Sequence, residues 1–297
     1  MNFWSRWFSN ALWGQARMAY GGMPMGSSRR APSARRGCSP RIILALLVIG
    51  GSVFMHFIGT TKYANDFTGR EQRLKYASKE EEVALGLQSA PQMIREMGGE
   101  HPDRKAQALV DQVGERLVAS TAVKDAGYQF DFHLLDDDQT VNAFALPGGQ
   151  IFITSALFSR LESEDQLAGV LGHEIGHVVG RHSNEQMAKQ GLIGGIASGV
   201  GILLSDGQSL GGQQVAQMVA QVTMNSYGRG DELESDKLGV HFMTQAGYNP
   251  EALIGVMEIL EKASGGGGQP EFMSTHPSPA NRVEKIKEEI AKMRQKS

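Results

Sequence analysis

The sequence has almost no cysteine, since Cys38 is the only one among 297 residues. An intramolecular disulfide is therefore excluded, and the chain cannot supply a Cys-rich zinc module or an iron–sulfur cluster. Any metal bound by this chain must be held by histidine and carboxylate side chains. The composition, 41% hydrophobic and 21% charged, is ordinary for a folded protein and excludes collagen-like and disordered classes.

Acidic residues are missing from the first part of the chain. Residues 1–41 contain seven Arg and no Asp or Glu, whereas the remainder carries 32 acidic and 22 basic residues, a net charge of −10. An acidic body of this kind is a poor match for a polyanion. We therefore expect no nucleic-acid partner.

Charge is also absent from residues 42–58, and with the next three residues the uncharged run reaches 20 residues. A helix of that length crosses the hydrocarbon core of a bilayer. The upstream arginines predict a single-pass anchor with a cytoplasmic N-terminus and the rest of the chain on the far side. The expected organisation is a basic tail (1–41), a transmembrane anchor (42–61), a polar linker (62–77) and one domain (78–297).

Two other interpretations of the N-terminal region stay open. A cleaved signal peptide would need an A-x-A site after Ile58, and none is present. The Arg-rich, acid-free leader is also typical of a mitochondrial transit peptide. The expected membrane is therefore the bacterial inner membrane, with the domain facing the periplasm, or alternatively the mitochondrial inner membrane.

Hydrophobic periodicity predicts an α+β domain that is mostly helical with a small antiparallel sheet. A strand is expected at 130–134, and a hairpin at 142–145 and 150–154 around the Pro147-Gly148-Gly149 turn. The Gly-rich stretch 191–204 is expected as a helix packed on the domain rather than a membrane-dipping segment, and Gly265–Gly268 as a flexible loop. The expected helices are 78–97 (interrupted at Pro91), 103–119, 164–181, 212–224, 231–246, 250–263 and 280–295.

One short motif carries chemistry: His173-Glu174-Ile175-Gly176-His177. Two histidines four residues apart on a helix lie on one face, so both rings can reach one ion, and Zn²⁺ suits imidazole ligands. Glu174 is placed to take a proton from water at the open coordination position. This H-E-x-x-H signature predicts one zinc ion per chain.

A catalytic zinc needs a third protein ligand. His182 follows His173 by nine residues, about 180° around a continuous helix, and so should face away. Glu232 lies on a later predicted helix with Asp236 one turn beyond it, whereas Glu234 points to another side. We expect Glu232 as the third ligand and Asp236 as the acceptor for the outer nitrogen of a ligand histidine.

Three further segments carry a family resemblance. They are residues 142–150 (AsnAlaPheAlaLeuProGlyGlyGln), Ser226–Arg229 and residues 275–279 (ThrHisProSerPro) with Arg282. Together with the zinc signature, the chain from about Ser78 resembles the membrane-associated gluzincin metalloendopeptidases related to HtpX, the CAAX prenyl protease and the mitochondrial Oma proteases. The resemblance implies a zincin-like fold and quality control of membrane or envelope proteins, and the single span favours the Oma-like or periplasmic branch.

The remaining site residues are expected from the motifs and from this resemblance. His276 is either an ordinary loop histidine or lies near the metal, where it donates to the oxyanion or caps the zinc in a resting form. Tyr227 is the other candidate for the oxyanion, and Arg282 is expected as a structural clamp. An extended substrate is expected to add along a strand edge. The expected edge residues are Asn142, Gly148, Gly149, Gln150, Ile151, Phe152 and Ile153.

These features predict a zinc-dependent endopeptidase that cleaves misfolded or membrane and envelope proteins with metal-activated water and Glu174 as general base. A membrane-tethered, chaperone-like holding protein with a latent site is the main alternative, and it should still hold its clients after the metal is removed. A zinc hydrolase for non-peptide substrates would share the metal site but would not need a strand edge.

Overall fold

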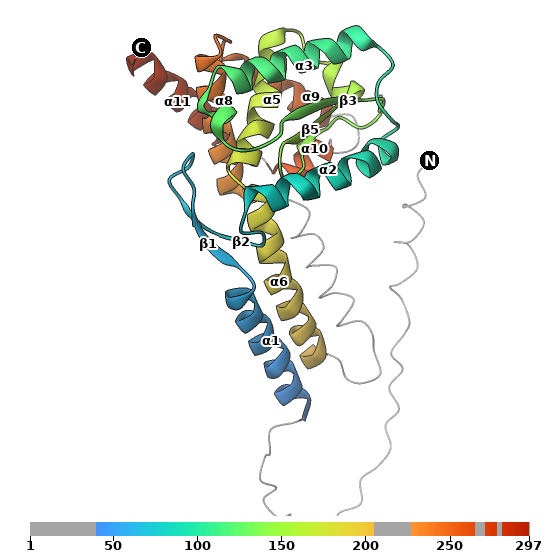
Figure 1. Cartoon of the computed structure of the whole chain (residues 1–297), viewed down its shortest axis with the longest axis vertical. Coiled ribbons are helices and arrows are strands. Elements are labelled where there is room, and N and C mark those ends of the chain that lie inside the picture. The colour runs from blue at the N-terminus through green and yellow to red at the C-terminus, as the bar shows by residue number, and fades with distance from the viewer. Residues whose placement is uncertain (1–39, 205–226, 265–270, 278–280, 297) are drawn as a thin grey trace, which may run out of the picture. The chain divides into compact units, whose positions relative to one another are not determined.

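The computed structural model describes residues 40–204, 227–277 except 265–270, and 281–296. The chain divides after Cys38, and only the second unit, Ser39–Ser297, contains described residues. The basic tail up to Ser39, the helix expected at 212–224 and the loop Gly265–Gly268 likewise fall outside them. Everything below concerns the second unit (Figure 1).

The described chain is mostly helical with little sheet, as the periodicity predicts. Ser78 caps the helix after it in a reciprocal box with Glu81, and that helix continues through Pro91 instead of being interrupted there. The helices are α1 (Pro40–Ile58), α2 (Lys79–Glu96), α3 (Arg104–Ala119), α4 (Ser155–Phe158), α5 (Glu164–Val179), α6 (His182–Leu204), α8 (Arg229–Gln245), α9 (Ala252–Ser264), α10 (Glu271–Thr275) and α11 (Arg282–Lys296). The strands are β1 (Thr61–Ala64), β2 (Glu71–Leu74), β3 (Asp131–Leu135), β4 (Ala143–Ala145) and β5 (Gln150–Thr154).

The main sheet has three strands in the order β3-β5-β4. The hairpin of β4 and β5 is antiparallel, as expected, but β3 pairs with β5 in parallel. Strand β5 is therefore central, and every residue in it is buried. The expectation that 150–154 forms the substrate edge is wrong, because both sides of that strand are already paired. Among the described strands of this sheet, β4 has an unpaired side.

Helices α5 and α8 form the centre of the body and approach each other through small residues. A Cβ on Gly172 would meet the Cα of Gly239 at 3.4 Å, and one on Gly176 would meet the Cα of Ser235 at 3.0 Å. Larger side chains at these positions would force the two helices apart. The helix with the H-E-x-x-H motif therefore lies directly against the helix with Glu232.

Residues 62–77, expected as a polar linker, contain the hairpin of β1 and β2. Its register pairs Thr61 with Leu74, and Leu74 is fully buried. Asn65 donates to the carbonyl of Val179, and Gln72 donates to the carbonyl of Gly180. The hairpin is thus fastened to the C-terminal end of α5.

The helix expected over 164–181 ends two residues early. Gly180 is its cap, and Arg181 has a φ of 56°, a left-handed conformation that ends the helix. The buried Arg181 guanidinium donates to Glu82 at 3.0 Å and to the carbonyl of Tyr76 at 3.2 Å. These contacts hold the turn, and α6 starts at His182 in a new direction.

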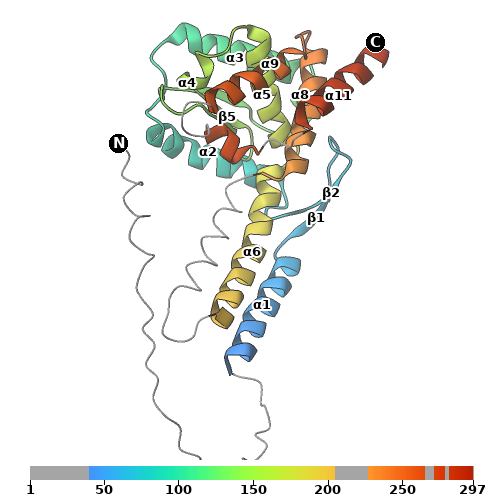
Figure 2. The same cartoon turned by 180° about the vertical axis from the view of Figure 1, so that it is seen from behind.

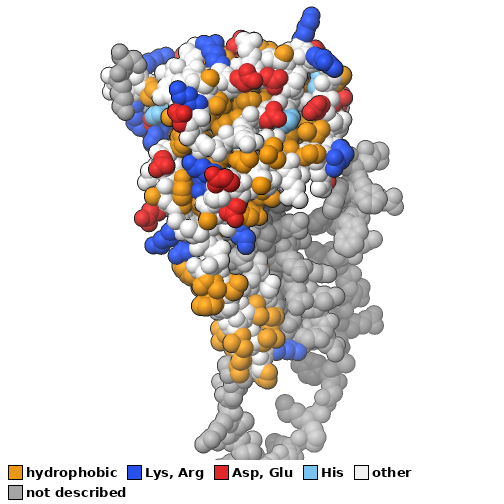
Figure 3. Space-filling model, viewed as in Figure 1, with side chains coloured by type: hydrophobic (Ala, Val, Ile, Leu, Met, Phe, Trp, Pro, Cys, Tyr) orange, Lys and Arg blue, Asp and Glu red, His pale blue; other side chains and the backbone are white. Residues whose placement is uncertain are grey.

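The Gly-rich stretch 191–204 is helical, but it does not pack on the domain as expected. It is the distal half of α6, which leaves the body and runs beside α1, as Figures 1 and 2 both show. Within the described ranges, α1 is the one helix long and apolar enough to span a membrane. Its exposed hydrophobic side chains form the lower surface in Figure 3.

Candidate metal centre

Four potential ligands from three parts of the chain meet in one buried cluster. His173 and His177 come from α5, Glu232 from α8, and His276 from the segment after α10. One nitrogen or oxygen of each lies within 4.8 Å of those of the others. The Nε2 atoms of His173 and His177 are 3.1 Å apart, and Glu232 lies 3.4 Å from the first and 3.3 Å from the second.

The orientation of His173 follows from Asp236. The Nδ1 atom of His173 is 2.8 Å from Oδ1 of Asp236, and an ionised carboxylate only accepts hydrogen bonds. Nδ1 is therefore the donor, and Nε2 faces the cluster. Arg282 donates to both oxygens of Asp236, at 2.6 and 2.8 Å, and so acts as the expected clamp.

His182 lies next to His177 and does not face away from it. That expectation is wrong because α5 ends before Arg181, so a continuous helical wheel does not apply. His182 Nδ1 is 2.9 Å from His177 Nδ1, and its Nε2 is 2.9 Å from Glu234. Glu234 accepts from Nε2–H of His182, and in that tautomer with one ring proton the Nδ1 atom of His182 accepts from Nδ1–H of His177. His177 thus also directs its Nε2 lone pair into the cluster.

The polar contacts behind His177 extend to the hairpin of β1 and β2. Arg70, in the loop between β1 and β2, lies 3.1 Å from Glu234, 3.2 Å from Asp231 and 3.0 Å from Glu185. Sequence analysis missed both His182 and Arg70 as parts of the site. Gly180, a potential helix cap one residue before Arg181, was the available signal that the helix ends there.

Burial and close polar partners together set the charge states of the potential ligands. Burial lowers the pKa of His177 well below its ordinary value, which favours the neutral ring that binds metals. Burial opposes ionisation of Glu232, but nearby His276 and the close contacts with His173 and His177 hold the pKa of that carboxyl well below its usual range. Burial likewise opposes charge on His173, yet hydrogen bonds to Asp236 and Glu232 raise its pKa to about 9. A metal ion must therefore displace a proton from His173 to bind.

Several buried polar atoms of the cluster have no hydrogen-bond partner among the described residues. They are both carboxylate oxygens of Glu174, Oε2 of Glu232 and Nε2 of His276. Buried polar atoms without partners are costly, and a bound ion with its water would satisfy them. Burial raises the pKa of Glu174, whose Oε1 lies 3.7 Å from Nε2 of His276. Two imidazoles and a carboxylate, with a further imidazole beside them, fit a divalent metal ion.

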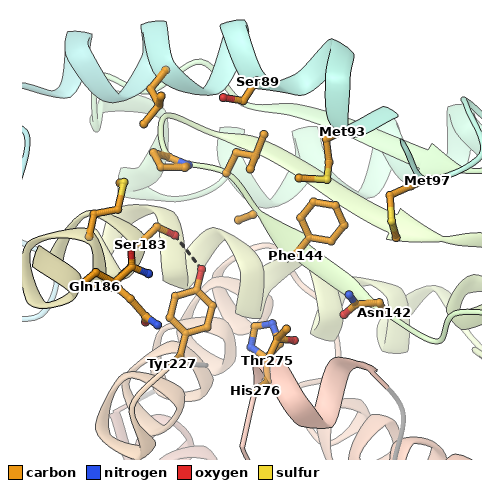
Figure 4. A pocket seen from close by; sticks show the side chains of 16 residues that line it. Ser89, Met93, Met97, Asn142, Phe144, Ser183, Gln186, Tyr227, Thr275 and His276 are labelled. Atoms are coloured by element: carbon orange, nitrogen blue, oxygen red, sulfur yellow. Dashed lines mark hydrogen bonds between the residues drawn. The ribbon is translucent and has the colours of Figure 1, made fainter. Parts of the chain in front are cut away.

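His276 and Tyr227 border the cluster from the same side. His276 is fully buried, with Nδ1 3.1 Å from Glu232, so it is no ordinary loop histidine. The Tyr227 ring stacks on His177 with 4.0 Å between centroids. Its hydroxyl forms a 2.8 Å hydrogen bond with Ser183 (Figure 4).

A cavity of about 520 Å³ opens beside His276 and Tyr227. Met93 of α2, Met97 at the end of that helix and Phe144 of β4 line one side of it (Figure 4). In the ladder of β4 with β5, the hydrogen-bonded pairs include Asn142 with Thr154 and Leu146 with Gln150. By alternation, the backbone groups of Ala143 and Ala145 point to the unpaired side of β4.

Only Asn142 of the expected edge residues lines this cavity. Ile151 and Ile153 belong to the core, and Phe152 stacks on its neighbours His133 and Phe144. Gln150 bonds to His133. Gly148 and Gly149 have φ of 88° and 115°, and a Cβ there would collide with the backbone of Val83 or Gln129. The turn therefore serves packing against neighbouring backbone, which is why glycine is needed there.

Comparisons with known proteins point to one family. Residues 104–290 match the family described as Peptidase family M48. The mitochondrial metalloendopeptidase OMA1 of Schizosaccharomyces pombe is 33% identical over 180 residues, which cover 60% of this chain and 51% of that protein. The beta-barrel assembly-enhancing protease of Yersinia pestis is 30% identical over 216 residues, 69% of this chain and 43% of that protein. The chain thus spans about half the length of these two curated relatives.

Proposed function

The chain belongs to peptidase family M48, and from this premise we propose that it is a membrane-anchored, zinc-dependent metalloendopeptidase. The observation that supports the proposal most strongly is the buried ligand cluster with the unpartnered carboxylate of Glu174, next to an apolar cavity and an unpaired strand. The main-chain groups of that strand bind a peptide without regard to its sequence.

The proposed ligands of the zinc ion are His173, His177 and Glu232, with one ion per chain. Two imidazoles and a carboxylate form the ligand set of many catalytic zinc sites. When bound, zinc polarises the scissile carbonyl and makes water a better nucleophile. Asp236 and His182 keep the ligand rings in the orientation and tautomer that metal binding needs.

Glu174 is the proposed general base. Its carboxylate is fully buried beside the ligands, and burial raises its pKa towards the range in which a carboxyl group takes up a proton and releases it again. It accepts the proton of the attacking water and passes it to the leaving amine. Nε2 of His276 and the ring of Tyr227 border the same space, so these two residues are the candidates for stabilising the oxyanion.

The substrate lies along β4 rather than along β5. The outward backbone groups of Ala145, which lines the cavity, bind an extended peptide, while Phe144 and Met93 contact its apolar side chains there. This arrangement favours unfolded protein segments, because a folded substrate has no free strand. Misfolded membrane or envelope proteins are the proposed clients.

The proposed organisation keeps a basic tail (1–41), an anchor (42–61), a connecting segment (62–77) and a catalytic domain (78–297). The positive charge of the tail places the N-terminus in the cytoplasm or mitochondrial matrix and the domain on the far side. The membrane is a bacterial inner membrane or the mitochondrial inner membrane. Relatives named for mitochondria and for beta-barrel assembly support these two settings.

The test uses the full-length chain in detergent, as wild type and as Glu174→Gln, with Glu115→Gln on the exposed face of α3 as matched control. Bound metal is measured by elemental analysis, and cleavage of unfolded casein is followed with and without a chelator. We expect one zinc per chain in all three proteins and chelator-sensitive cleavage by wild type and Glu115→Gln only. Cleavage by Glu174→Gln would contradict the proposed base.

The same experiment separates the enzyme from a holding protein. A chaperone-like protein would bind casein without cleaving it, and binding would persist after the chelator has removed the metal. Stoichiometric zinc without turnover by the wild type would favour that second function.

A further inference from the structure

The distal half of α6 runs antiparallel to the anchor helix α1. Nδ1 of His56 lies 3.1 Å from the carbonyl of Ala188, Ser52 lies beside Gly195, and Ile49 lies beside Gly199. Residue numbers fall along α1 as they rise along α6, so the two helices pass each other in opposite directions. Both views of the chain show them side by side (Figures 1 and 2).

Glycine allows this close approach. A Cβ at position 195 would overlap the side chain of Ser52, and a Cβ at position 199 would overlap Ile49 and meet the carbonyl oxygen of Ala45 at 3.1 Å. In water, helices usually associate by interlocking large apolar side chains. Helices in bilayers instead come together through small residues, because lipid removes the hydrophobic drive for burying large ones.

The distal half of α6 exposes an uncharged surface that includes large apolar side chains. No charged residue occurs between Lys189 and Asp206. Ile196 and Val200 are each 36% exposed, and they continue the exposed apolar surface of α1, where Leu46 is 59% exposed. Residues 188–204 rise about 24 Å along the helix, most of a hydrocarbon core.

The register sets the depth of this segment. Ala188 is level with His56 near the end of α1, and Gly199 is level with the stretch between Ala45 and Ile49. If α1 crosses the bilayer, residues 191–204 lie at the depth of the acyl chains. The exposed side of residues 191–204 then faces lipid, because water does not reach the apolar stretch of α1 in the bilayer.

We propose that Gly191–Leu204 is a second membrane-embedded helix, paired with α1 and in contact with lipid acyl chains through Ile196 and Val200. This inference rests on α1 being the membrane anchor of the proposed function.

The proposal narrows the class of substrate. The proximal part of α6 supplies Ser183, Gln186 and Gln190 to the cavity beside His276. Met187 lines that cavity and also the crevice between α1 and α6. The cavity therefore opens where α6 enters the bilayer. It is suited to extended peptide segments that directly adjoin a membrane-embedded stretch of the client.

Depth-dependent fluorescence quenching tests the proposal in the full-length chain in phosphatidylcholine vesicles. Cys38→Ser removes the native thiol, so a single cysteine can be introduced and labelled with a nitrobenzoxadiazole dye. The test position is Ile196→Cys, the lipid reference is Leu46→Cys in α1, and the water reference is Glu115→Cys in α3. Each labelled protein must retain the wild-type zinc content and unfolding midpoint.

We expect the dye at Ile196 to behave like the dye at Leu46, with strong quenching by nitroxides on the acyl chains and protection from aqueous iodide. Quenching by iodide at Ile196, as at Glu115, would overturn the proposal. Protection from both quenchers would also overturn it, because another protein or a second copy would then cover this face. Iodide quenching of the dye at Leu46 would contradict the assignment of α1 as the membrane anchor. Iodide quenching at Ile196 alone would contradict only the second membrane-embedded helix.

Two glycine substitutions test the pairing without a dye. Gly199→Leu places a side chain against Ile49, whereas Gly191→Leu meets nothing within 4 Å. We expect Gly199→Leu to lower the thermal unfolding midpoint of the chain in vesicles and Gly191→Leu to leave it unchanged. Equal midpoints for the two variants would contradict the close packing of α6 on α1.

Discussion

The two histidines of the H-E-x-x-H motif lie one helical turn apart, yet the protein holds them in different ways. Behind His173 stands a carboxylate, Asp236, which is held by the fully buried Arg282. Behind His177 lies an imidazole ring, His182, whose contacts lead through Glu234 to Arg70. The side chain of Arg70 is 35% exposed.

The partners behind His173 and His177 both orient a histidine ring, but they differ in how strongly they are themselves held. Each of the two histidines directs its Nδ1 atom to the partner behind it, which turns its Nε2 atom towards the metal position. On the His173 side the contacts end in a buried ion pair, so removing either partner leaves an uncompensated charge. On the His177 side they end in an ion-pair network that water screens. We therefore expect substitutions on the His173 side to have the larger effects.

The largest effect is expected for Arg282→Ala. This change leaves Asp236 and Glu232 buried without their guanidinium partner, which costs about 3–5 kcal/mol of the free energy of unfolding. Thermal and denaturant unfolding of the full-length chain measure it. The control is Arg294→Ala on the same helix, an exposed pair with Glu251, with an expected change below about 1 kcal/mol. Similar losses of unfolding free energy in both variants would contradict the larger effect expected for the buried ion pair of Arg282.

The next effect is expected for Asp236→Asn. The amide keeps the shape of the side chain but not the charge that Nδ1–H of His173 and Arg282 require. Zinc affinity should fall about 10–100-fold, as it does when the hydrogen-bond partner of a ligand histidine is lost. Competition with a chromophoric chelator measures the affinity, with exposed Asp138→Asn as control. Wild-type affinity in Asp236→Asn would contradict the role assigned to this carboxylate.

His182→Ala should weaken zinc binding less, by about tenfold, because the lost partner of His177 is an imidazole and not a carboxylate. His182→Gln offers both an acceptor and a donor, so it should restore part of the affinity if hydrogen bonding is the cause. His241→Ala, a histidine paired with Glu289 outside the cluster, serves as control. The same chelator competition applies, and equal affinities for the Ala and Gln variants would assign His182 a packing role only.

The smallest effect is expected for Arg70→Ala. Its ion pairs with Glu185, Asp231 and Glu234 are partly exposed, so the free energy of unfolding should change by about 1 kcal/mol or less. Because salt screens such pairs, the difference from wild type should shrink at 1 M NaCl. Unfolding curves at low and high salt measure it. A loss of unfolding free energy as large as that for Arg282→Ala would contradict the expected difference between the contacts behind His173 and those behind His177.

The helical elements and the core of the site were predictable from local patterns. A spacing of four residues places His173 and His177 on one helix face, and the same rule relates Glu232 to Asp236. The structure brings these residues together with Glu174, and it adds His276, for which the residues alone left two interpretations open. The α+β class followed from the alternation of periodicities, because helices and strands differ in the period at which apolar residues recur.

The wrong expectations about His182, β5 and residues 191–204 each depended on contacts between distant segments. His182 was misplaced because the buried contacts of Arg181 with Glu82 and Tyr76 end the helix two residues early. Strand β5 was taken for an edge because its parallel pairing with β3 leaves no mark on either strand's own sequence. The stretch 191–204 was expected on the domain because its glycines do not reveal which helix they approach.

The sequence by itself determined the motif helix, its pair of histidines, the glutamate beside them and the uncharged run near the N-terminus, since all of these depend on spacing along one element. Only the tertiary structure decided which strand offers a free edge, what stands behind each histidine and where the second half of α6 lies. Those outcomes depend on packing between residues far apart in the chain. Such contacts are selected by shape and burial across the whole fold, so no local period encodes them.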